Sequence, residues 1–169
     1  MVLTHLTKKG SVKMVDVGDK ATTKRRAVVQ GKVLMKPTTL RAITAERVKK
    51  GNVLETARIA GIMAAKETYK LIPLCHPLNV TNVKVDFKII QPKKIKDLKN
   101  MPPAVIEITT TVEAIDRTGV EMEALVGTTI SALTIYDMCK AVDRGMQITD
   151  IKLMEKSGGR SGHYKRNHE

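Results

Sequence analysis

Aromatic side chains are scarce in this sequence of 169 residues, which contains one Phe, three Tyr and no Trp. Proteins that bind single-stranded nucleic acid stack bases on such rings, so the chain is poorly equipped for that task. Long uncharged apolar runs are also missing, because none reaches the roughly 20 residues that span a bilayer. No segment has the basic amphipathic pattern of a helix that lies on a membrane surface. We therefore expect neither a nucleic acid nor a membrane as partner.

Cysteine is almost as rare, with only Cys75 and Cys139, both in segments that read as buried. Zinc is not expected, because Cys75 and His76 are adjacent, Cys139 is isolated, and no second ligand pair has the spacing of a tetrahedral site. No charged-then-apolar leader marks a signal peptide. The sequence thus predicts a cytoplasmic protein with reduced thiols and no bound metal.

Acidic residues are outnumbered, since 30 Lys and Arg face 17 Asp and Glu and leave a net charge of +13. Such an excess predicts an anionic partner, through electrostatic steering and local concentration of negative ligands. A polyphosphate metabolite remains once nucleic acid and membrane are set aside. The length suits one domain with a single core.

Hydrophobic periodicity and turn residues divide the chain into alternating elements. The patterns predict strands over 26–36, 79–90, 105–115 and 146–154, helices over 38–48, 52–70 and 118–143, and an exposed hairpin loop over 91–103. This order is the βαββαβ arrangement of an α+β, ferredoxin-like fold, with an antiparallel sheet and helices packed on one face. We expect an arm over 1–24, a single domain over 25–155 and a glycine- and base-rich tail over 156–169.

One acid occupies an unexpected place. Asp137 is the only charged side chain between Glu123 and Lys140, in a run that otherwise reads as buried helix. A carboxylate in low dielectric acquires a partner or shifts its pKa. Lys140 follows at i+3, on the same helix face, where the two side chains can meet. The pair is either a structural ion pair or an acid–base couple, in which desolvation would depress the pKa of Lys140.

The sequence offers three further acid–base candidates. His76 is the only histidine outside the termini, and it sits in the proline-locked connector 71–78, either as a core residue or as a side chain held for function. Glu121 and Glu123 fall in the first turn of the long helix. Thr118 and Glu121 form a capping-box pattern, so capping accounts for Glu121 but leaves Glu123 without such a duty.

Two basic segments could hold phosphate. The tail sequence KSGGRSG at 156–162 combines glycine amides with Lys156 and Arg160, although it lacks the spacing of a Walker loop and could equally be a mobile basic tail. Lys50 lies in a Lys-Lys-Gly string that could simply end a helix with solvated lysines.

Together these stretches resemble one family closely, the molybdenum cofactor biosynthesis protein C family of cyclic pyranopterin monophosphate synthases. The resemblance covers nearly the whole chain. The matching runs are MVDV at 14–17, KGNVLETARIAGI at 50–62, LIPLCHPL at 71–78, TGVEMEAL at 118–125, ALTIYDMCKAV at 132–142 and KSGGRSG at 156–162.

The resemblance implies a lyase that converts (8S)-3′,8-cyclo-7,8-dihydroguanosine 5′-triphosphate, a cyclised dihydro-GTP, to cyclic pyranopterin monophosphate and pyrophosphate. It also implies a homohexamer built as a trimer of dimers, with active sites at the dimer contact. No cofactor is required, although Mg²⁺ could accompany the triphosphate.

The resemblance also implies roles for individual residues. It assigns Asp137 and Lys140 as the catalytic pair. It assigns substrate binding to Lys50, Leu74, Cys75, His76, Glu121, Met122, Glu123, Lys156 and Arg160, with Arg160 standing where the family often has a Lys. The tail then contributes to the phosphate site.

The rival interpretation is a non-catalytic RNA-binding module, which a basic ferredoxin-like domain invites. The RNA-recognition version of this fold needs the string K/R-G-F/Y-G/A-F-V-x-F/Y on a central strand. Neither 79–90 nor 105–115 contains it. The rival therefore ranks far below the enzyme.

Overall fold

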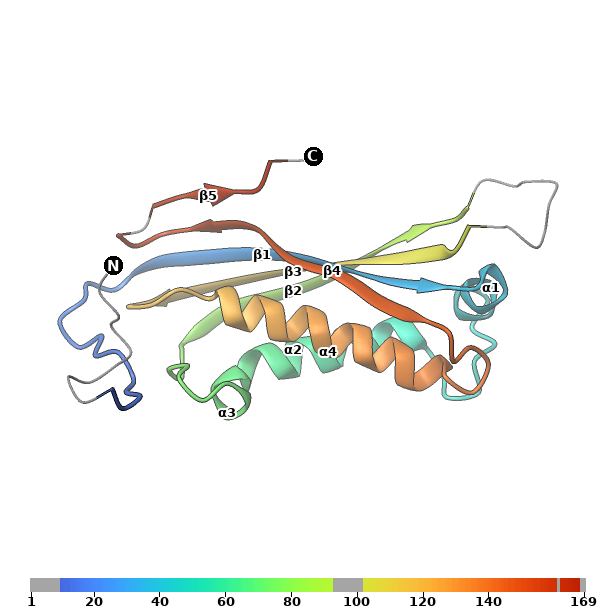
Figure 1. Cartoon of the computed structure of the whole chain (residues 1–169), viewed down its shortest axis with the longest axis horizontal. Helices are drawn as coiled ribbons and strands as arrows, with labels where there is room; N and C mark the ends of the chain where they lie inside the picture. The colour runs from blue at the N-terminus through green and yellow to red at the C-terminus, as the bar shows by residue number, and fades with distance from the viewer. Residues whose placement is uncertain (1–9, 93–101, 161, 168–169) are drawn as a thin grey trace.

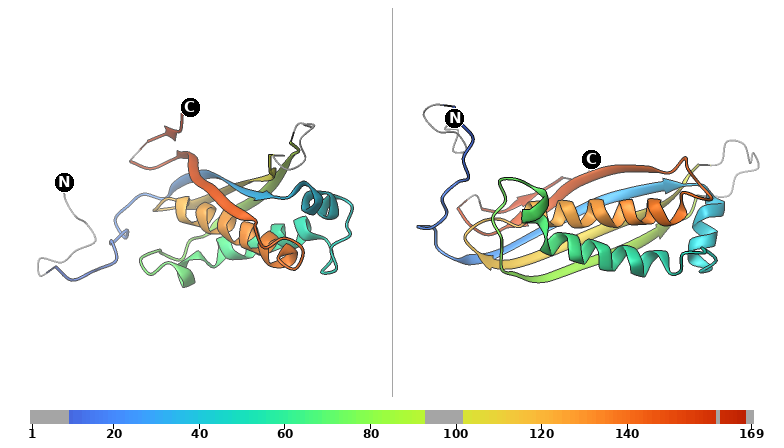
Figure 2. Two further views of the ribbon diagram at one scale, coloured as in Figure 1. Left: turned by 45° about the vertical axis from the view of Figure 1, so that its right-hand side comes forward. Right: turned by 90° about the horizontal axis from the view of Figure 1, so that it is seen from below.

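The protein is described by a computed structural model that covers residues 10–92, 102–160 and 162–167. An antiparallel sheet forms one layer, and two long helices pack side by side beneath it in a second layer (Figure 1). The opposite face of the sheet carries no helix among the described residues, as the further views show (Figure 2). The architecture confirms the predicted α+β, ferredoxin-like fold.

Five strands make the sheet, in the spatial order β2-β3-β1-β4-β5. Their bounds are β1 Thr23–Met35, β2 Val80–Ile90, β3 Ala104–Asp116, β4 Gln147–Ser157 and β5 Tyr164–Lys165. The central pair, β1 and β3, is in register over its whole length, from Thr23 opposite Asp116 to Met35 opposite Ala104. Burial alternates along β1, as expected for a strand with one covered face.

The helices are α1 Pro37–Thr44, α2 Val53–Lys66, α3 Thr68–Leu71 and α4 Glu121–Cys139. Small residues let α2 and α4 approach closely. A Cβ on Gly61 would lie 2.9 Å from the carbonyl oxygen of Gly127, so neither position has room for a side chain. Ser131 Oγ donates to the carbonyl of Ala57 at 3.1 Å across the same contact. The small-residue face of α2 therefore packs on α4.

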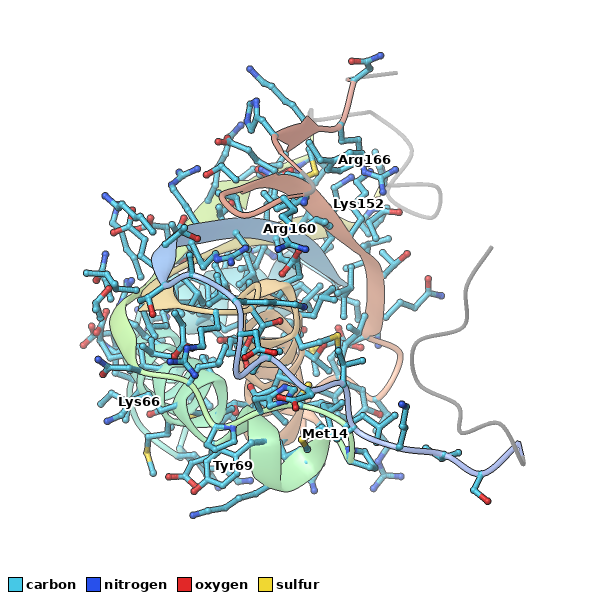
Figure 3. All side chains as sticks on the ribbon, turned by 90° about the vertical axis from the view of Figure 1, so that its left-hand side faces the viewer. Met14, Lys66, Tyr69, Lys152, Arg160 and Arg166 are labelled. Carbon is cyan, nitrogen blue, oxygen red and sulfur yellow. The ribbon has the colours of Figure 1, made fainter. Side chains whose placement is uncertain are left out.

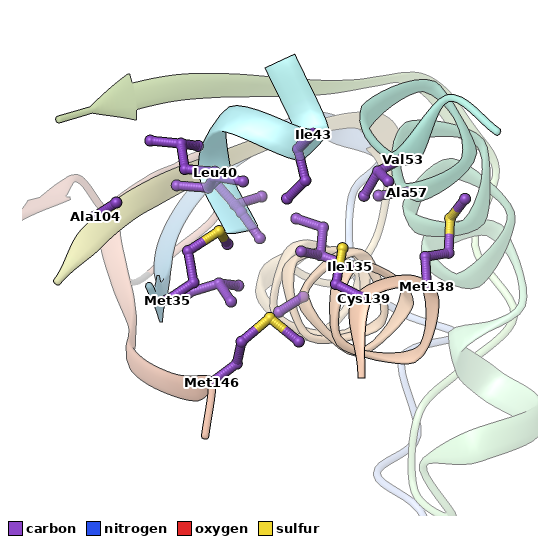
Figure 4. Close-up of a cluster of buried hydrophobic side chains, with 14 of the residues drawn as sticks. Met35, Leu40, Ile43, Val53, Ala57, Ala104, Ile135, Met138, Cys139 and Met146 are labelled. Carbon is purple, nitrogen blue, oxygen red and sulfur yellow. The ribbon is translucent and has the colours of Figure 1, made fainter. Parts of the chain in front are cut away.

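The larger core cluster lies between the sheet and the end of the helix pair where α1 closes the fold (Figure 4). Leu40 and Ile43 of α1 reach into it, together with Val53 of α2 and Ile135 of α4. A second cluster, which includes Val29, Val112 and Ala124, underlies the first turns of α4. Both ends of α4 are thus anchored to the sheet.

Several predicted boundaries of helices and strands were wrong. The Thr118 capping box does not form: α4 begins at Glu121, with Val120 at the N-cap and no side-chain cap bond. The first helix ends at Thr44 and the second divides into α2 and α3. The last strand continues through Ser157. Of the predicted hairpin loop, residues 93–101 lie outside the described residues.

Candidate active site

Three charged side chains meet at the C-terminal end of α4. Asp137 Oδ1 lies 2.7 Å from Lys140 Nζ, and Asp137 Oδ2 lies 2.7 Å from Lys50 Nζ. Lys50 Nζ also donates to the main-chain carbonyl of Asp137 at 3.0 Å, where the last carbonyls of a helix lack intrahelical partners. The loop before α2 and the last turns of α4 together build this cluster, which we call the lysine–aspartate cluster.

The lysine–aspartate cluster is more exposed than the sequence suggested. The Asp137 side chain is 55% exposed, so the expectation of a buried carboxylate was wrong. Hydrogen bonds from Lys140 and then Lys50 lower the pKa of Asp137 to about 2. The hydrogen bond to Asp137 raises the pKa of Lys140, which is the reverse of the predicted depression. The cluster therefore holds two cationic side chains around one carboxylate.

A different environment surrounds Glu123 in the first turn of α4. Its side chain is buried, with 4% of the residue exposed. Burial is the main cause that raises the pKa of Glu123 to about 7; a hydrogen bond from its own main-chain amide opposes the rise, and the charges of Glu121 and Asp116 add to it. A carboxyl group that titrates near neutrality can both accept and donate a proton at physiological pH. Glu123 is therefore the side chain best suited to acid–base work at this end of the helix.

The connector between α3 and β2 lies beside Glu123. Burial, and then the charge of Glu123, raise the pKa of Cys75. Leu74, Cys75 and His76 are all half-buried. The connector is fixed at both ends, since Ile72 N donates to the carbonyl of Thr68 at 3.0 Å and Asn79 N donates to Asp116 Oδ2 at 3.0 Å. The structure thus brings the predicted connector residues to the start of α4.

A basic cleft of about 630 Å³ opens at this same end of the molecule. Lys20, Arg25, Arg117 and Arg160 line it together with a single acid, Glu121, and the glycines Gly119 and Gly159. Figure 3 views this end, with Arg160 beside the strands and Tyr69 and Met14 toward the helices. The excess of positive charge suits a phosphorylated ligand.

Lys156 lies on β4, three residues before Gly159 of the basic cleft, and does not itself line the cleft. The register places it opposite Ala27, whose side chain is buried beneath the helices. Side chains directly opposite each other share a face of the sheet, so the Lys156 side chain lies on the helix-covered face. The chain then turns through Gly158 and Gly159 to Arg160. Of the predicted residues, Arg160 and Glu121 line the cleft.

Sequence reasoning missed Lys20, Arg25 and Arg117. Arg25 is 8% exposed and shares the inward-facing alternation of Ala27 and Val29. A cation on the apolar face of a strand is the signal that could have found it, because a buried charge requires specific partners. Lys20 precedes β1 and Arg117 follows β3, and neither carries a local pattern that separates it from other surface cations.

The predicted site residues form two groups at opposite ends of α4. Lys50, Asp137 and Lys140 gather at one end, while Glu123 and the basic cleft lie at the other. Asp137 lies fourteen positions after Glu123 on one continuous helix, which corresponds to about 21 Å at the rise of an α-helix. Met122 lies half-buried beside Glu123. One chain does not bring the two groups together.

Comparison with known proteins decides the family. The model of the MoaC family matches residues 14–159. The chain belongs to the MoaC family. This membership confirms the resemblance found in the sequence motifs, and the matched region includes all the elements from β1 to β4 and every predicted site residue except Arg160.

Curated MoaC relatives match along nearly their whole length. A protein of Mycobacterium tuberculosis named cyclic pyranopterin monophosphate synthase 3 is 57% identical over 165 residues, covering 98% of this chain and 87% of the relative. Proteins named cyclic pyranopterin monophosphate synthase from Parvibaculum lavamentivorans and Desulfitobacterium hafniense are 52% and 50% identical, covering 96% and 97% of this chain and 96% and 94% of the relatives.

Two structural findings bear on partners. No helix among the described residues is long and apolar enough to cross a membrane. Within residues 10–92, 102–160 and 162–167, no group of three or more His, Cys, Asp and Glu side chains gathers as a metal site would require.

Proposed function

We propose that this protein is a cyclic pyranopterin monophosphate synthase, which converts the cyclised dihydro-GTP to cyclic pyranopterin monophosphate and pyrophosphate. Relatives that share half or more of its residues carry that name. The observation that carries the proposal is the basic cleft beside a carboxyl group with a pKa of about 7. The cleft suits a triphosphate, and the carboxyl group suits the proton transfers that purine opening and pterin closure require.

Glu123 is the proposed proton carrier near the base and sugar. Forming the cyclic phosphate requires a sugar hydroxyl oxygen to attack the α-phosphorus while the bond from that phosphorus to the β-phosphate bridge breaks. The hydroxyl proton must leave, and pyrophosphate departs with the bonding electrons. Cys75 and His76 lie on the connector next to Glu123 and would orient the rings.

The cations at both ends of α4 would neutralise the phosphate groups of the substrate. Arg25, Arg160 and Lys156 lie at the start of α4, where they would neutralise the triphosphate and stabilise charge on the departing pyrophosphate. Lys50 and Lys140 carry positive charge at the other end of the helix, held in place by Asp137. No organic cofactor is needed for these steps, and Mg²⁺ can accompany the triphosphate.

Assembly follows from the distance between the two groups. Side chains about 21 Å apart on one rigid helix cannot close on the same reacting atoms. We infer a dimer contact that sets the lysine–aspartate cluster of one subunit against the Glu123 end of its partner, within a homohexamer of three dimers. The half-exposed lysine–aspartate cluster would then be covered by the partner subunit and the substrate.

The first experiment tests activity and assembly together. Purified protein is incubated with the cyclised dihydro-GTP, and the pterin product and pyrophosphate are measured. Asp137→Asn and Glu123→Gln are each expected to be nearly inactive. When the two variants are mixed under conditions that exchange subunits, about a quarter of wild-type activity should return, because half of the dimers are mixed and each mixed dimer keeps one intact site.

The matched control mixes two variants of the same helix end. Asp137→Asn and Lys140→Ala both damage the lysine–aspartate cluster, so each mixed dimer carries a damaged cluster in both sites and no activity should return. No recovery from the first mixture, with subunit exchange shown by mass spectrometry, would rule out the composite site. No conversion by the wild-type protein would rule out the proposed function.

A further inference from the structure

The glycine turn after β4 packs directly against Arg25. Gly158 and Gly159 both have positive φ, at 97° and 74°, a conformation that favours glycine. A Cβ built on Gly159 would overlap Nη1 of Arg25 and lie 2.7 Å from its Cζ, closer than real Cβ atoms come to other atoms. The missing side chain of Gly159 is therefore the space that the guanidinium group occupies.

The rest of the guanidinium group is held by the end of β3. Arg25 Nε donates to the carbonyl of Asp116 at 3.2 Å, and Nη2 donates to the carbonyl of Arg117 at 3.1 Å. In the part of the chain that the structure describes, no carboxylate lies within ion-pair distance of Arg25. Arg25 is thus a buried cation, fixed between two carbonyls and a glycine, in the wall of the basic cleft.

We propose that Gly159 is a positioning residue, whose lack of a side chain holds the Arg25 guanidinium where it meets a phosphate of the substrate. This inference rests on the proposed function, because it assigns Arg25 to the substrate's phosphates. A fixed cation stabilises charge without reorganising during the reaction. The sequence suggested instead that the tail glycines turn their amides toward the anion.

Gly158 makes a useful contrast to Gly159. A Cβ on Gly158 would overlap the main-chain carbonyl oxygen of Lys24, and a main-chain atom can move only if the strand moves. A Cβ on Gly159 meets the end of a side chain, which can rotate away. An alanine at 159 should therefore displace Arg25 and spare the strand, so its main effect should be on ligand binding.

The test is a double-mutant cycle with inorganic pyrophosphate as the probe, measured by calorimetry on the full chain. Gly159→Ala should weaken pyrophosphate binding about tenfold, the effect of losing one charge-assisted contact. In an Arg25→Lys background, which removes the overlapping Nη atoms, Gly159→Ala should weaken binding by less than about twofold. The KM for the cyclised dihydro-GTP should follow the same pattern.

Gly162→Ala is the control for backbone strain. Gly162 also has positive φ, at 64°, but nothing lies within 4 Å of its built Cβ. It should share the loss of thermal stability without the tenfold change in binding. Equal weakening by Gly159→Ala in both Arg25 backgrounds, or equal weakening by Gly162→Ala, would overturn the proposal.

Two safeguards keep the test decisive. If Gly159→Ala alone does not fold, the double variant with Arg25→Lys should fold and show a cooperative melting transition, and failure of this rescue would also overturn the proposal. Pyrophosphate binding and melting do not depend on turnover. A wild-type protein that binds pyrophosphate but converts no substrate would count against the proposed function and leave the coupling between Gly159 and Arg25 measurable.

Discussion

The two ends of α4 carry charge in opposite ways. At the C-terminal end, Asp137 satisfies both carboxylate oxygens with Lys50 and Lys140, and all three side chains are about half exposed. At the N-terminal end, Glu123 and Arg25 are buried, and burial raises the pKa of Glu123 to about 7. At one end the charges are paired, with one cation in excess, whereas at the other end loss of solvent sets the pKa of the acid.

This difference shows which end is complete within one chain. Burial within the chain already raises the pKa of Glu123, so this pKa does not depend on a partner subunit. The lysine–aspartate cluster is screened by water, and exposed ion pairs contribute little in high dielectric. Its electrostatic effect would grow once a partner subunit and the substrate exclude that water.

The largest expected effect is a loss of turnover when the lysine–aspartate cluster at the exposed end of α4 is disrupted. Asp137→Asn leaves Lys50 and Lys140 without their shared carboxylate, and we expect turnover to fall roughly a hundredfold or more. Because the Asp137 side chain is 55% exposed, the melting temperature should change by no more than about 2 °C. Single-turnover conversion and thermal melting measure the two effects. Near-normal turnover in a folded variant would remove Asp137 from the mechanism.

The next largest expected effect is the pH dependence of stability that the buried Glu123 causes. Glu123 has an ordinary pKa of 4.5 when unfolded and about 7 when folded, so the folded state holds its proton more tightly. The protein therefore loses stability as pH rises from about 4.5 to 7, by on the order of 3 kcal/mol. Glu123→Gln should remove this loss and be more stable than wild type at pH 8, while turnover falls at least tenfold.

Denaturant unfolding at pH 5 and pH 8 measures the stability change. Glu121→Gln is the matched variant, because the charge of Glu121 helps to raise the pKa of Glu123. Removing that charge should narrow the pH range over which the protein loses stability, without abolishing the loss. Identical pH dependence in wild type and Glu123→Gln would mean that Glu123 does not titrate in this range.

The difference between the ends also marks how far the sequence could predict the structure. Alternation along β1 and β3 and the strand–helix order were sufficient for the fold, because one-sided burial imposes a period of two. The i+3 spacing of Asp137 and Lys140 correctly predicted their contact. Exposure of the last turn of α4 could not be predicted, since it depends on where neighbouring elements stop.

Local patterns failed where a distant residue supplied the contact. The capping box at Thr118 did not form, and the acid of the turn before α4 is instead Asp116, which accepts from the main-chain amides of Asn79 and Arg117. Lys50 looked like a solvated helix end, and its bond to Asp137 spans 87 positions. Such pairings are set by the tertiary fold, so neither could be found by spacing alone.

The smallest expected effect concerns the support of Lys50. Asn52 caps α2, since its side-chain oxygen accepts from Glu55 N at 3.0 Å, and its amide donates to Glu46 Oε1 at 3.1 Å. Asn52→Ala should cost about 1 kcal/mol of stability and, by loosening the turn that carries Lys50, lower turnover about threefold. Asn52→Ser keeps a cap acceptor without placing a second carboxylate against Glu46, and it should recover most of the lost stability in denaturant melts and most of the lost turnover in kinetics. Equal losses in the two variants would show that the cap does not position Lys50, and the exposed end of α4 would then be held by its ion pairs alone.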